Sequence, residues 1–280
     1  MGSIYALVAL GFLLIYVAVG AINFAQGDMV MLGAFFGVTF ATMLGWPLWL
    51  AYFLSMLLML VFGYVFERVA YYPLRDKPFL TVIISTIAVG IILRNLAIQD
   101  WAWGPEEFFF GTLVSDVPIE VGDAVILPQH LFIIGITVAL LVAQYLFFEK
   151  TFLGRKLQAT AQDQEAARLM GIKVERMMII TFVMSSFLAA IAGLILAPVL
   201  FVSTNMGFHV GVKAFVASIV GGFGSMAGAI TGGLFLGLLE VFGAAYISSA
   251  YKDAFAVLIM LVVLFVRPQG FFGEKIQEKV

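Results

Sequence analysis

The chain lacks most of the chemistry on which enzymes depend. It contains no cysteine, which excludes disulfides, thiolate nucleophiles and cysteine-ligated zinc. Its two histidines, His130 and His209, lie far apart in the sequence, and we interpret both as structural. No Gly-x-x-x-x-Gly-Lys-Ser/Thr phosphate-binding loop and no Ser/His/Asp or metal-ligand constellation occurs. We therefore expect a protein that is not an enzyme and that binds no cofactor or metal of its own.

Charged residues are also scarce. They make up 11% of the 280 residues, whereas 63% are hydrophobic, so the bilayer rather than water is the expected solvent. The net charge of −2 and the absence of a dense basic patch give no support for nucleic-acid binding. At about 20 residues per crossing, the length allows roughly eight spans. The sequence predicts an all-α, polytopic transmembrane protein with a single transmembrane domain over residues 1–280.

Basic and acidic residues alternate between the apolar runs. These runs cover residues 3–22, 28–44, 48–66, 79–98, 130–148, 177–202, 213–247 (glycine-rich) and 253–266. Twelve of the 15 basic residues lie in segments 67–78, 149–176 and 267–279, while segment 99–129 contains six acidic residues and no lysine or arginine. The positive-inside rule places the basic segments in the cytoplasm and segment 99–129 outside. After residue 203, three short crossings or one crossing plus a re-entrant pair would both reach a cytoplasmic tail, and the side of the N-terminus stays open.

Three polar residues interrupt the first two apolar runs. Asn23, Gln26 and Asp28 stand between segments that are each short. One interpretation is a tight loop at the membrane surface. The other is a discontinuous helix whose unwound backbone faces a translocation path near the midplane.

Small residues recur every four positions in the glycine-rich region. One row consists of Ala217, Gly221, Ser225, Ala229, Gly233 and Gly237, and the other of Gly224, Gly228 and Gly232. Such rows let helix backbones approach closely in lipid, which we favour over direct ligand contact. A break at Gly221–Gly222 would create a second discontinuous element facing the first.

Glu240 continues the first of these rows. A carboxylate at this depth is costly unless it faces protein or water. It could pair with Arg94 or Lys252, or it could line an aqueous path and couple to protons.

Residues 157–172, LQATAQDQEAARLMGI, form a polar, alanine-rich stretch between two apolar runs. Its apolar residues do not form one stripe, so the expected helix is unsuited to lie on lipid. Small side chains on several sides suit insertion into a groove of another polypeptide, and Gly171 would end the helix. A solvated loop helix is the alternative.

The same stretch carries a resemblance to a known family. Glu165-Ala166-Ala167 followed by Gly171 resembles the EAA-x3-G loop of ABC-importer permeases, although the Ile-x-Leu-Pro of the general form is absent downstream. With other motifs across residues 2–273, the string AQDQEAARLMGIKVERM resembles the LivH-type permeases of branched-chain amino acid ABC importers. Those motifs are Tyr5-Ala6-Leu7, Asn23-Phe24-Ala25-Gln26-Gly27-Asp28, Lys213-Ala214-Phe215, Gly221-Gly222-Phe223-Gly224-Ser225, Glu240 and Arg267-Pro268-Gln269-Gly270.

The resemblance implies an ABC-importer permease fold in a bacterial or archaeal cytoplasmic (inner) membrane. It implies a second homologous permease, two cytoplasmic ATPase subunits that hydrolyse the ATP, and a periplasmic or extracellular substrate-binding protein. The cytoplasmic loop at about 149–176 would dock the ATPases. The docking residues would be Gln162, Asp163, Glu165, Ala166, Ala167, Leu169 and Gly171.

Leucine, isoleucine and valine are the substrates that the resemblance implies. Amides, urea, other amino acids or aromatic acids remain open within the same class. An ion-coupled secondary transporter using Glu240 or Asp28 is the alternative from a different class. A passive channel for small polar solutes is a third, but it leaves the polar stretch without a role.

The charge pattern makes a prediction about orientation. Cysteines introduced at Glu107 and at Lys156 of this cysteine-free chain should react with a membrane-impermeant thiol reagent from opposite sides of intact cells. Labelling of position 156 from outside would contradict the predicted topology.

Overall fold

The computed structural model describes residues 1–273 apart from Asp76, Asp116 and Asp123. Two residues of the acidic segment (Asp116 and Asp123) and two of the tail (Lys275 and Lys279) therefore lie outside the described residues.

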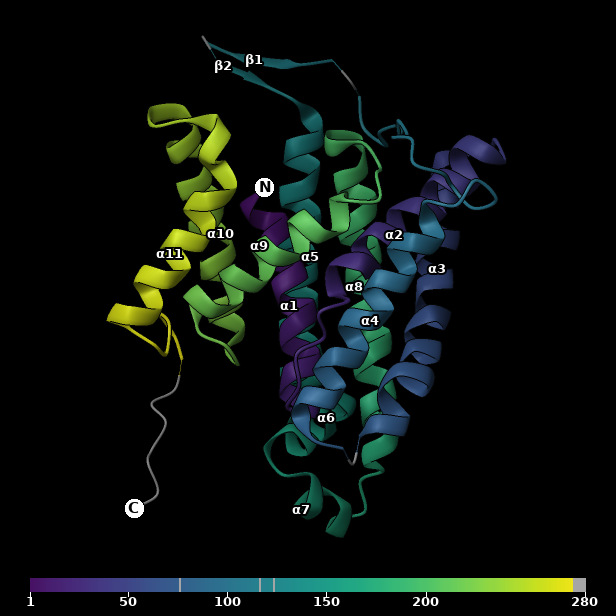
Figure 1. Ribbon diagram of the computed structural model, residues 1–280, viewed down its shortest axis with the longest axis vertical. Helices are drawn as coiled ribbons and strands as arrows, with labels where there is room; N and C mark the ends of the chain where they lie inside the picture. The colour runs from purple at the N-terminus through teal and green to yellow at the C-terminus, as the bar shows by residue number, and fades with distance from the viewer. Residues whose placement is uncertain (76, 116, 123, 274–280) are drawn as a thin grey trace.

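Helices dominate the described part of the chain (Figure 1). They are α1 (Gly2–Val19), α2 (Gln26–Val38), α3 (Leu48–Phe66), α4 (Phe79–Ala97), α5 (Pro128–Lys150), α6 (Phe152–Gln162), α7 (Gln164–Leu169), α8 (Val174–Leu200), α9 (Met206–Gly221), α10 (Met226–Tyr246) and α11 (Lys252–Val266). Two π-helical turns, Thr39–Met43 and Glu67–Tyr71, extend α2 and α3, and short 3-10 turns occupy Tyr72–Leu74 and Ser249–Tyr251.

Six helical segments of the described chain are long and apolar enough to cross a membrane. They are α1, Leu48–Leu74, α4, α5, α8 and α10. Three further helices are shorter, namely α2 with 13 residues, α9 with 16 and α11 with 15. The expected number of about eight spans is therefore approximate, because short helices make up the remainder.

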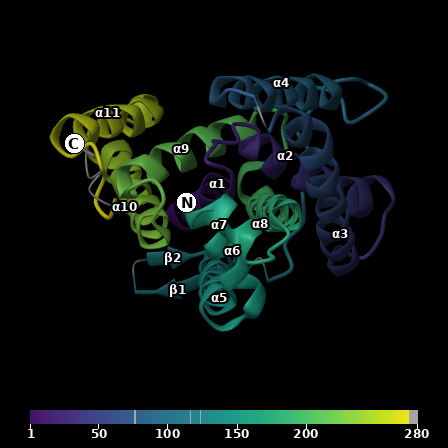
Figure 2. The same cartoon turned by 90° about the horizontal axis from the view of Figure 1, so that it is seen from below.

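Helices α1 and α8 form the centre of the bundle. In each, 72% of the most apolar window is buried, against 17% in α4 and in α5. Helix α1 contacts α2, α5, α6, α8, α9 and α10, and Figure 2 shows it surrounded by these elements. The same view places α4 and α11 on one side of the molecule and α5 and α6 on the opposite side.

The helix ends follow local sequence signals. Proline precedes α3 and α4 and opens α5, where its missing N–H costs no hydrogen bond. Gly20 ends α1 with φ of 74°, a left-handed conformation that glycine adopts readily. Ser225 caps α10, because its side chain accepts a hydrogen bond from the Gly228 N–H at 3.2 Å.

The acidic segment contains a feature that the apolar pattern did not predict. Strands β1 (Ile119–Val121) and β2 (Ala124–Ile126) form an antiparallel hairpin, in which Ile119 pairs with Ile126. Gly122 has φ of 62° in the connecting turn. Trp103 of the same segment packs onto α2, because its ring stacks on Phe35 at 4.8 Å and its indole N–H donates to the Thr39 hydroxyl at 2.8 Å.

Both predicted helix breaks are present. The chain leaves helical geometry between Val19 and Gln26, and again at Gly222, whose φ is 112°. The two short helices that follow or precede these breaks face each other, since Gly27 of α2 lies against the backbone of Gly207 and Gly211 of α9. A β-carbon at any of these three glycines would overlap the opposing helix.

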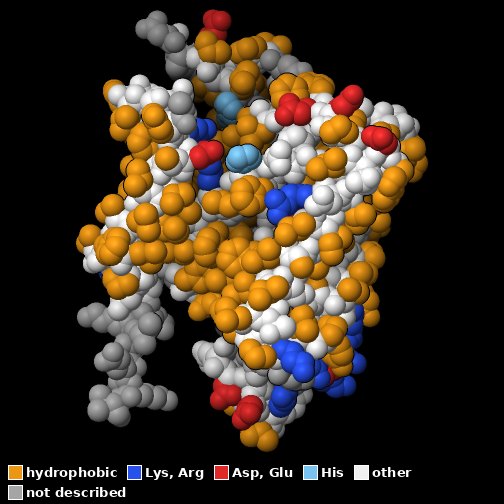
Figure 3. Space-filling model, viewed as in Figure 1, with side chains coloured by type: hydrophobic (Ala, Val, Ile, Leu, Met, Phe, Trp, Pro, Cys, Tyr) orange, Lys and Arg blue, Asp and Glu red, His pale blue; other side chains and the backbone are white. Residues whose placement is uncertain are grey.

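Charged side chains gather mainly toward the two ends of the bundle, and acidic ones lie at both ends (Figure 3). Lysine and arginine side chains gather toward the lower end in this view, where α6 and α7 lie, and several acidic side chains lie along the upper edge. The band between them is mostly hydrophobic.

The contact between α9 and α10 makes a prediction about packing. A β-carbon at Gly228 would lie 2.6 Å from the carbonyl oxygen of Gly221 and 2.8 Å from that of Gly222, so Gly228→Leu should force two backbones apart. We expect a loss of about 1–3 kcal/mol or more in stability and less protein in the membrane. The control is Gly135→Leu on α5, where nothing lies within 4 Å of the added carbon. Equal melting temperatures in detergent for both variants would contradict the prediction.

Candidate functional site

The first polar centre joins α2 to α4. Asp28 lies in the first turn of α2, and its carboxylate Oδ1 is 3.0 Å from Nε of Arg94 near the end of α4. The side chain of Asp28 is only 5% exposed, whereas that of Arg94 is 26% exposed. Gly90 provides the necessary space, because a β-carbon there would overlap the Asp28 carboxylate. The pair satisfies a charge that would otherwise be costly to bury.

Asn23 and Gln26, which we expected beside Asp28, are both buried in the protein. The Asn23 side-chain oxygen accepts from the Ala25 N–H at 3.1 Å, which shapes the turn into α2. The Ser185 hydroxyl donates to the Gln26 side-chain oxygen at 2.9 Å. Burial of both residues favours the discontinuous element over a surface loop. In this conformation their polar atoms are engaged by the chain itself.

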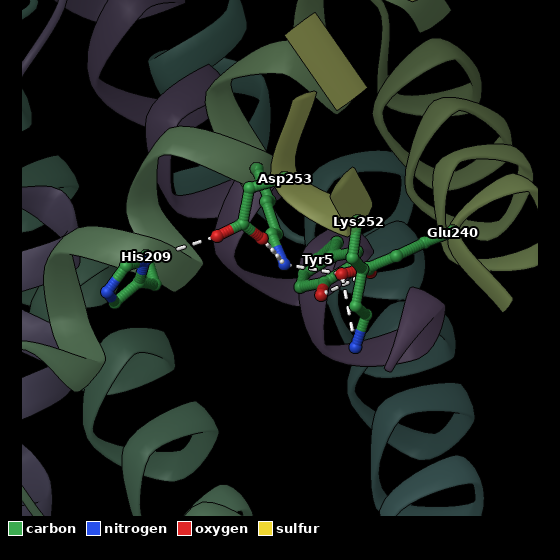
Figure 4. Close-up of polar contacts among 6 residues, drawn as sticks. Tyr5, His209, Glu240, Lys252 and Asp253 are labelled. Atoms are coloured by element: carbon green, nitrogen blue, oxygen red, sulfur yellow. Dashed lines mark hydrogen bonds and ion pairs between the residues drawn. The ribbon is translucent and has the colours of Figure 1, made fainter. Parts of the chain in front are cut away.

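The second polar centre surrounds Glu240 (Figure 4). The side chain of Glu240 is 2% exposed, and its carboxylate accepts a hydrogen bond from the Tyr5 hydroxyl at 2.6 Å. The same carboxylate forms an ion pair with Lys213 of α9 and lies 3.3 Å from the ammonium of Lys252 of α11. Of the two partners considered from sequence, Lys252 is therefore present, whereas Arg94 is committed to Asp28.

Lys213 extends this centre toward the surface. Its ammonium also pairs with Asp253 of α11 at 2.7 Å, and the other Asp253 oxygen lies 3.8 Å from Nδ1 of His209. The centre thereby ties α1, α9, α10 and α11 together through charge-assisted hydrogen bonds.

Sequence reasoning assigned no role to Lys213 or Asp253 and interpreted His209 as structural. The distribution of basic residues could have indicated these contacts. After the twelve that set the predicted topology are removed, the three that remain are Arg94, Lys213 and Lys252. All three form ion pairs in the two polar centres.

The prediction of one continuous docking helix is wrong. Residues 157–171 do not form one helix, because α6 ends at Gln162 and α7 begins at Gln164. Asp163 breaks the run with extended backbone, and its carboxylate accepts hydrogen bonds from the N–H groups of Glu165 at 2.8 Å and Ala166 at 3.0 Å. This is an N-cap, which starts a new helix rather than continuing the old one.

Most of the expected docking residues lie on the surface. Gln162, Asp163, Glu165, Ala166, Leu169 and Gly171 are exposed, whereas Ala167 is buried. Leu169 is 89% and Met170 82% exposed, which is unusual for large apolar side chains at the charged end of the molecule. Gly171 has φ of 80° and turns the chain toward α8.

The glycines of the two small-residue rows separate into two contacts. Gly221 of α9 faces Gly228 and Gly232 of α10, while Gly233 and Gly237 lie against α1 at Ala6 and Gly2. Gly224 lies in the turn between α9 and α10, with φ of 100° and the Tyr16 ring 4.0 Å from the position of an added β-carbon.

A separate groove of about 640 Å³ lies between α1, α5, α6, α8 and α10. Its lining is mainly apolar and includes neither polar centre. Across the described residues, no group of three or more histidine or acidic side chains is arranged to hold a metal ion. The chemistry available at the two centres is thus ion pairing and hydrogen bonding.

Comparisons with known proteins agree along the whole chain. The family described as "Branched-chain amino acid transport system / permease component" matches residues 1–264. The chain is 36% identical to the high-affinity branched-chain amino acid transport system permease protein BraD of Pseudomonas aeruginosa, over 100% of this chain and 95% of BraD. It is 34% identical to the corresponding permease protein LivH of Escherichia coli K12, over 100% of this chain and 94% of LivH.

A solved structure supports the fold. PsaBC from Streptococcus pneumoniae in complex with Fab has a TM-score of 0.51 and 18% identity, with 96% of this chain and 90% of that chain covered. The sequence matches along the chain show that it belongs to the family of branched-chain amino acid transport system permease components.

Proposed function

We propose that this chain is a permease subunit of an ATP-driven importer of leucine, isoleucine and valine in the cytoplasmic membrane. A second homologous permease would complete the translocation path. Two ATPase subunits would supply energy, and a binding protein would deliver the amino acid. The observation that carries the proposal is the full-length similarity to BraD and LivH, whose names state this transport activity.

The sequence indicates that a partner chain hydrolyses the ATP. It has no phosphate-binding loop, so another chain must hydrolyse ATP. Helix α7 offers that chain a contact, since Leu169 and Met170 project from the bundle while Ala167 anchors the helix. An exposed apolar pair beside charged residues suits a groove on a protein partner.

Movement of α7 would reach the polar centres through α1. The Gln164 side-chain amide donates to the carbonyl oxygen of Ala18 at 3.1 Å, in the last turn of α1. Near the other end of the same helix, Tyr5 donates to Glu240. We propose that ATP-driven motion of the ATPases tilts α1, so that helices packed on its glycine contacts rock between outward- and inward-open states.

We propose that Asp28 and Glu240 line the translocation path. Asn23 and Gln26 would hold the broken segment beside it in place. Each carboxylate is buried beside a cation that is itself partly exposed: Arg94 is 26% exposed beside Asp28, and Lys252 is 39% exposed beside Glu240. Ionisable groups inside a membrane protein usually face such a path or another helix.

Transport tests the function directly. The permease pair, reconstituted with its ATPases and binding protein in vesicles, should take up leucine, isoleucine and valine only when ATP is present. A proton gradient without ATP should drive none. Uptake driven by the gradient alone would replace the proposal with an ion-coupled transporter, and uptake of amides or urea in place of leucine would correct the substrate class.

The docking role of α7 predicts the behaviour of Ala166→Arg. Ala166 is exposed in the isolated chain, so permease abundance should be unchanged. Recovery of the ATPases with tagged permease should fall about tenfold, because a long charged side chain must enter a tight contact. Glu165→Lys should act in the same direction, with a smaller effect if that side chain lies at the rim.

Ala166→Ser is the matched control, since serine keeps the side chain small. Full ATPase recovery with Ala166→Arg, at equal permease abundance, would mean that α7 does not dock the ATPases and is a solvated loop helix.

A further inference from the structure

Helix α5 is polar on the side that faces the bundle. Its four buried residues, Gln129, Ile133, Thr137 and Gln144, are spaced by four, four and seven positions and therefore share one helical face. This face packs against α1 and α8, whereas the outward face exposes apolar side chains such as Leu131. Three of the four buried residues are polar, which is the reverse of an ordinary buried face.

Most of the polar side-chain atoms on this face have no hydrogen-bond partner. Among the described residues, six buried side-chain nitrogen or oxygen atoms lack a hydrogen bond, and four of them belong to α5. They are Oε1 of Gln129, Oγ1 of Thr137, and both the oxygen and the nitrogen of the Gln144 amide. Buried polar groups are normally hydrogen-bonded, because leaving one unpaired is costly. Gln144 stands out, since its whole amide is unpaired.

Gln144 lines the apolar groove of about 640 Å³ on the side of the molecule where Figure 2 shows α5 and α6. Leu141 and Phe148 of α5, Leu14 of α1 and Ile230 of α10 form part of the same wall. Small-molecule sites typically have volumes of roughly 300–1,000 Å³ and mostly apolar linings with a few polar groups. The Gln144 side chain is 5% exposed, so the groove has such a polar group held inside an apolar wall.

The groove is also in contact with the segment that reaches α7. Three of its lining residues, Leu157, Gln158 and Ala161, belong to α6. Ala18 lines it as well, and the carbonyl oxygen of Ala18 accepts the hydrogen bond from Gln164 of α7. A displacement of α7 would therefore move the wall of the groove.

The Gln144 amide complements the head group of a free α-amino acid. Its NH₂ group donates and its oxygen accepts, and both are attached to one carbon. The carboxylate and the ammonium of an α-amino acid are likewise attached to one carbon, so a single amide can contact both. Of the described lining residues, Glu149 alone is charged, and it is exposed. Neutral hydrogen bonds hold a zwitterion less tightly than ion pairs would, which suits a site that must release its ligand.

A lipid acyl chain is the other ligand that an apolar groove in a bilayer could take. It would cover the apolar wall but would leave both Gln144 atoms unpaired in apolar surroundings. An amino acid with an aliphatic side chain covers the wall and pairs both atoms, so the observations favour it.

We propose that this groove is the release site for the translocated amino acid at the α7 end of the path. Gln144 binds the carboxylate and the ammonium, while Leu14, Phe148 and Ile230 contact the aliphatic side chain. The inference rests on the proposed import function and names the residues from which the solute leaves. The site is distinct from the two polar centres, whose residues do not line the groove.

Binding can be measured directly because the chain contains no cysteine. Leu141→Cys places a single thiol of this chain on the groove wall, one helical turn from Gln144. In the purified complex of both permeases and both ATPases, leucine should slow the reaction of this thiol with a maleimide severalfold and in a saturable way. Glutamate at the same concentrations should not, and adding Gln144→Met should abolish the protection by leucine.

Transport separates a ligand contact from a structural role. Gln144→Met keeps a long side chain but removes two atoms that have no partner, so the melting temperature should be unchanged or higher. Leucine taken up per ATP hydrolysed, in vesicles with the binding protein, should nevertheless fall about tenfold through lost hydrogen bonds to charged groups. Gln129→Met is the structural contrast. The Gln129 Nε2 donates to the carbonyl oxygen of Ile195 at 2.8 Å, so this variant should melt at a lower temperature.

Ala227→Phe tests the groove without altering Gln144. Ala227 is exposed and lines the groove, so the added ring should fill space there without disturbing the packed helices. We expect a similar loss of leucine uptake per ATP, with the complex intact. Ala245→Phe is the matched control, because Ala245 is an exposed alanine of the same helix outside the groove.

The remaining outcomes also decide the matter. If wild-type complex takes up leucine, but leucine does not slow labelling and neither Gln144→Met nor Ala227→Phe lowers uptake per ATP, the groove holds water or lipid and the inference is wrong. If these variants lose the second permease, the groove is a subunit contact and the inference is again wrong. If wild-type complex takes up no leucine with ATP, the proposed function fails. Protection of the thiol by leucine would then still support the site, and unchanged labelling would overturn both.

Discussion

Burying a carboxylate inside an apolar bundle is costly, and the structure is arranged around two of them. Asp28 and Glu240 are almost completely enclosed, so each requires a cation in place before the surrounding helices can close. Arg94 brings α4 to α2, while Tyr5, Lys213 and Lys252 bring α1, α9 and α11 to α10. The hydrophobic surfaces of these helices would tolerate many arrangements in lipid, because lipid chains are as apolar as their side chains. The ion pairs therefore contribute specificity, by selecting one arrangement among many.

Close backbone contact makes these pairs geometrically feasible. Lys213 can reach Glu240 only if α9 and α10 approach closely, and the Gly221 contact with Gly228 permits that approach. The same holds for α1, where Gly233 accommodates the backbone of Ala6 one position after Tyr5. Since α1 also accepts a hydrogen bond from Gln164 at its far end, one buried helix connects the exposed α7 to the Glu240 centre. A rigid helix held at both ends is a suitable element to couple two sites, because it can tilt without unfolding.

The sequence predicted much of the fold and fewer of the contacts. Apolar runs indicated the long helices. Glycine and polar residues that interrupt these runs indicated the breaks before Gln26 and after Gly221. The partner of a buried charge depends on which helices are neighbours, which periodicity does not reveal. For Glu240 the sequence thus offered Arg94 or Lys252 as partners, of which Lys252 is present, but it did not indicate Tyr5, 235 positions away. The division between α6 and α7 was missed although Asp163 is a typical N-cap residue, because the alanine-rich stretch reads as continuous helix on either side.

The charges of the two centres balance, and this bears on which solutes can pass. Asp28, Glu240 and Asp253 contribute three negative charges, and Arg94, Lys213 and Lys252 contribute three positive charges. A zwitterionic amino acid adds no net charge to this face. A substrate with an extra charge on its side chain would leave that charge uncompensated, which is costly wherever the path excludes water. A translocation path lined by the two centres would therefore discriminate by net charge. It would discriminate little between leucine and valine, because one methylene is worth only about 1–3 kcal/mol in an apolar pocket. In the proposed importer, selection among aliphatic side chains would then fall mainly to the binding protein.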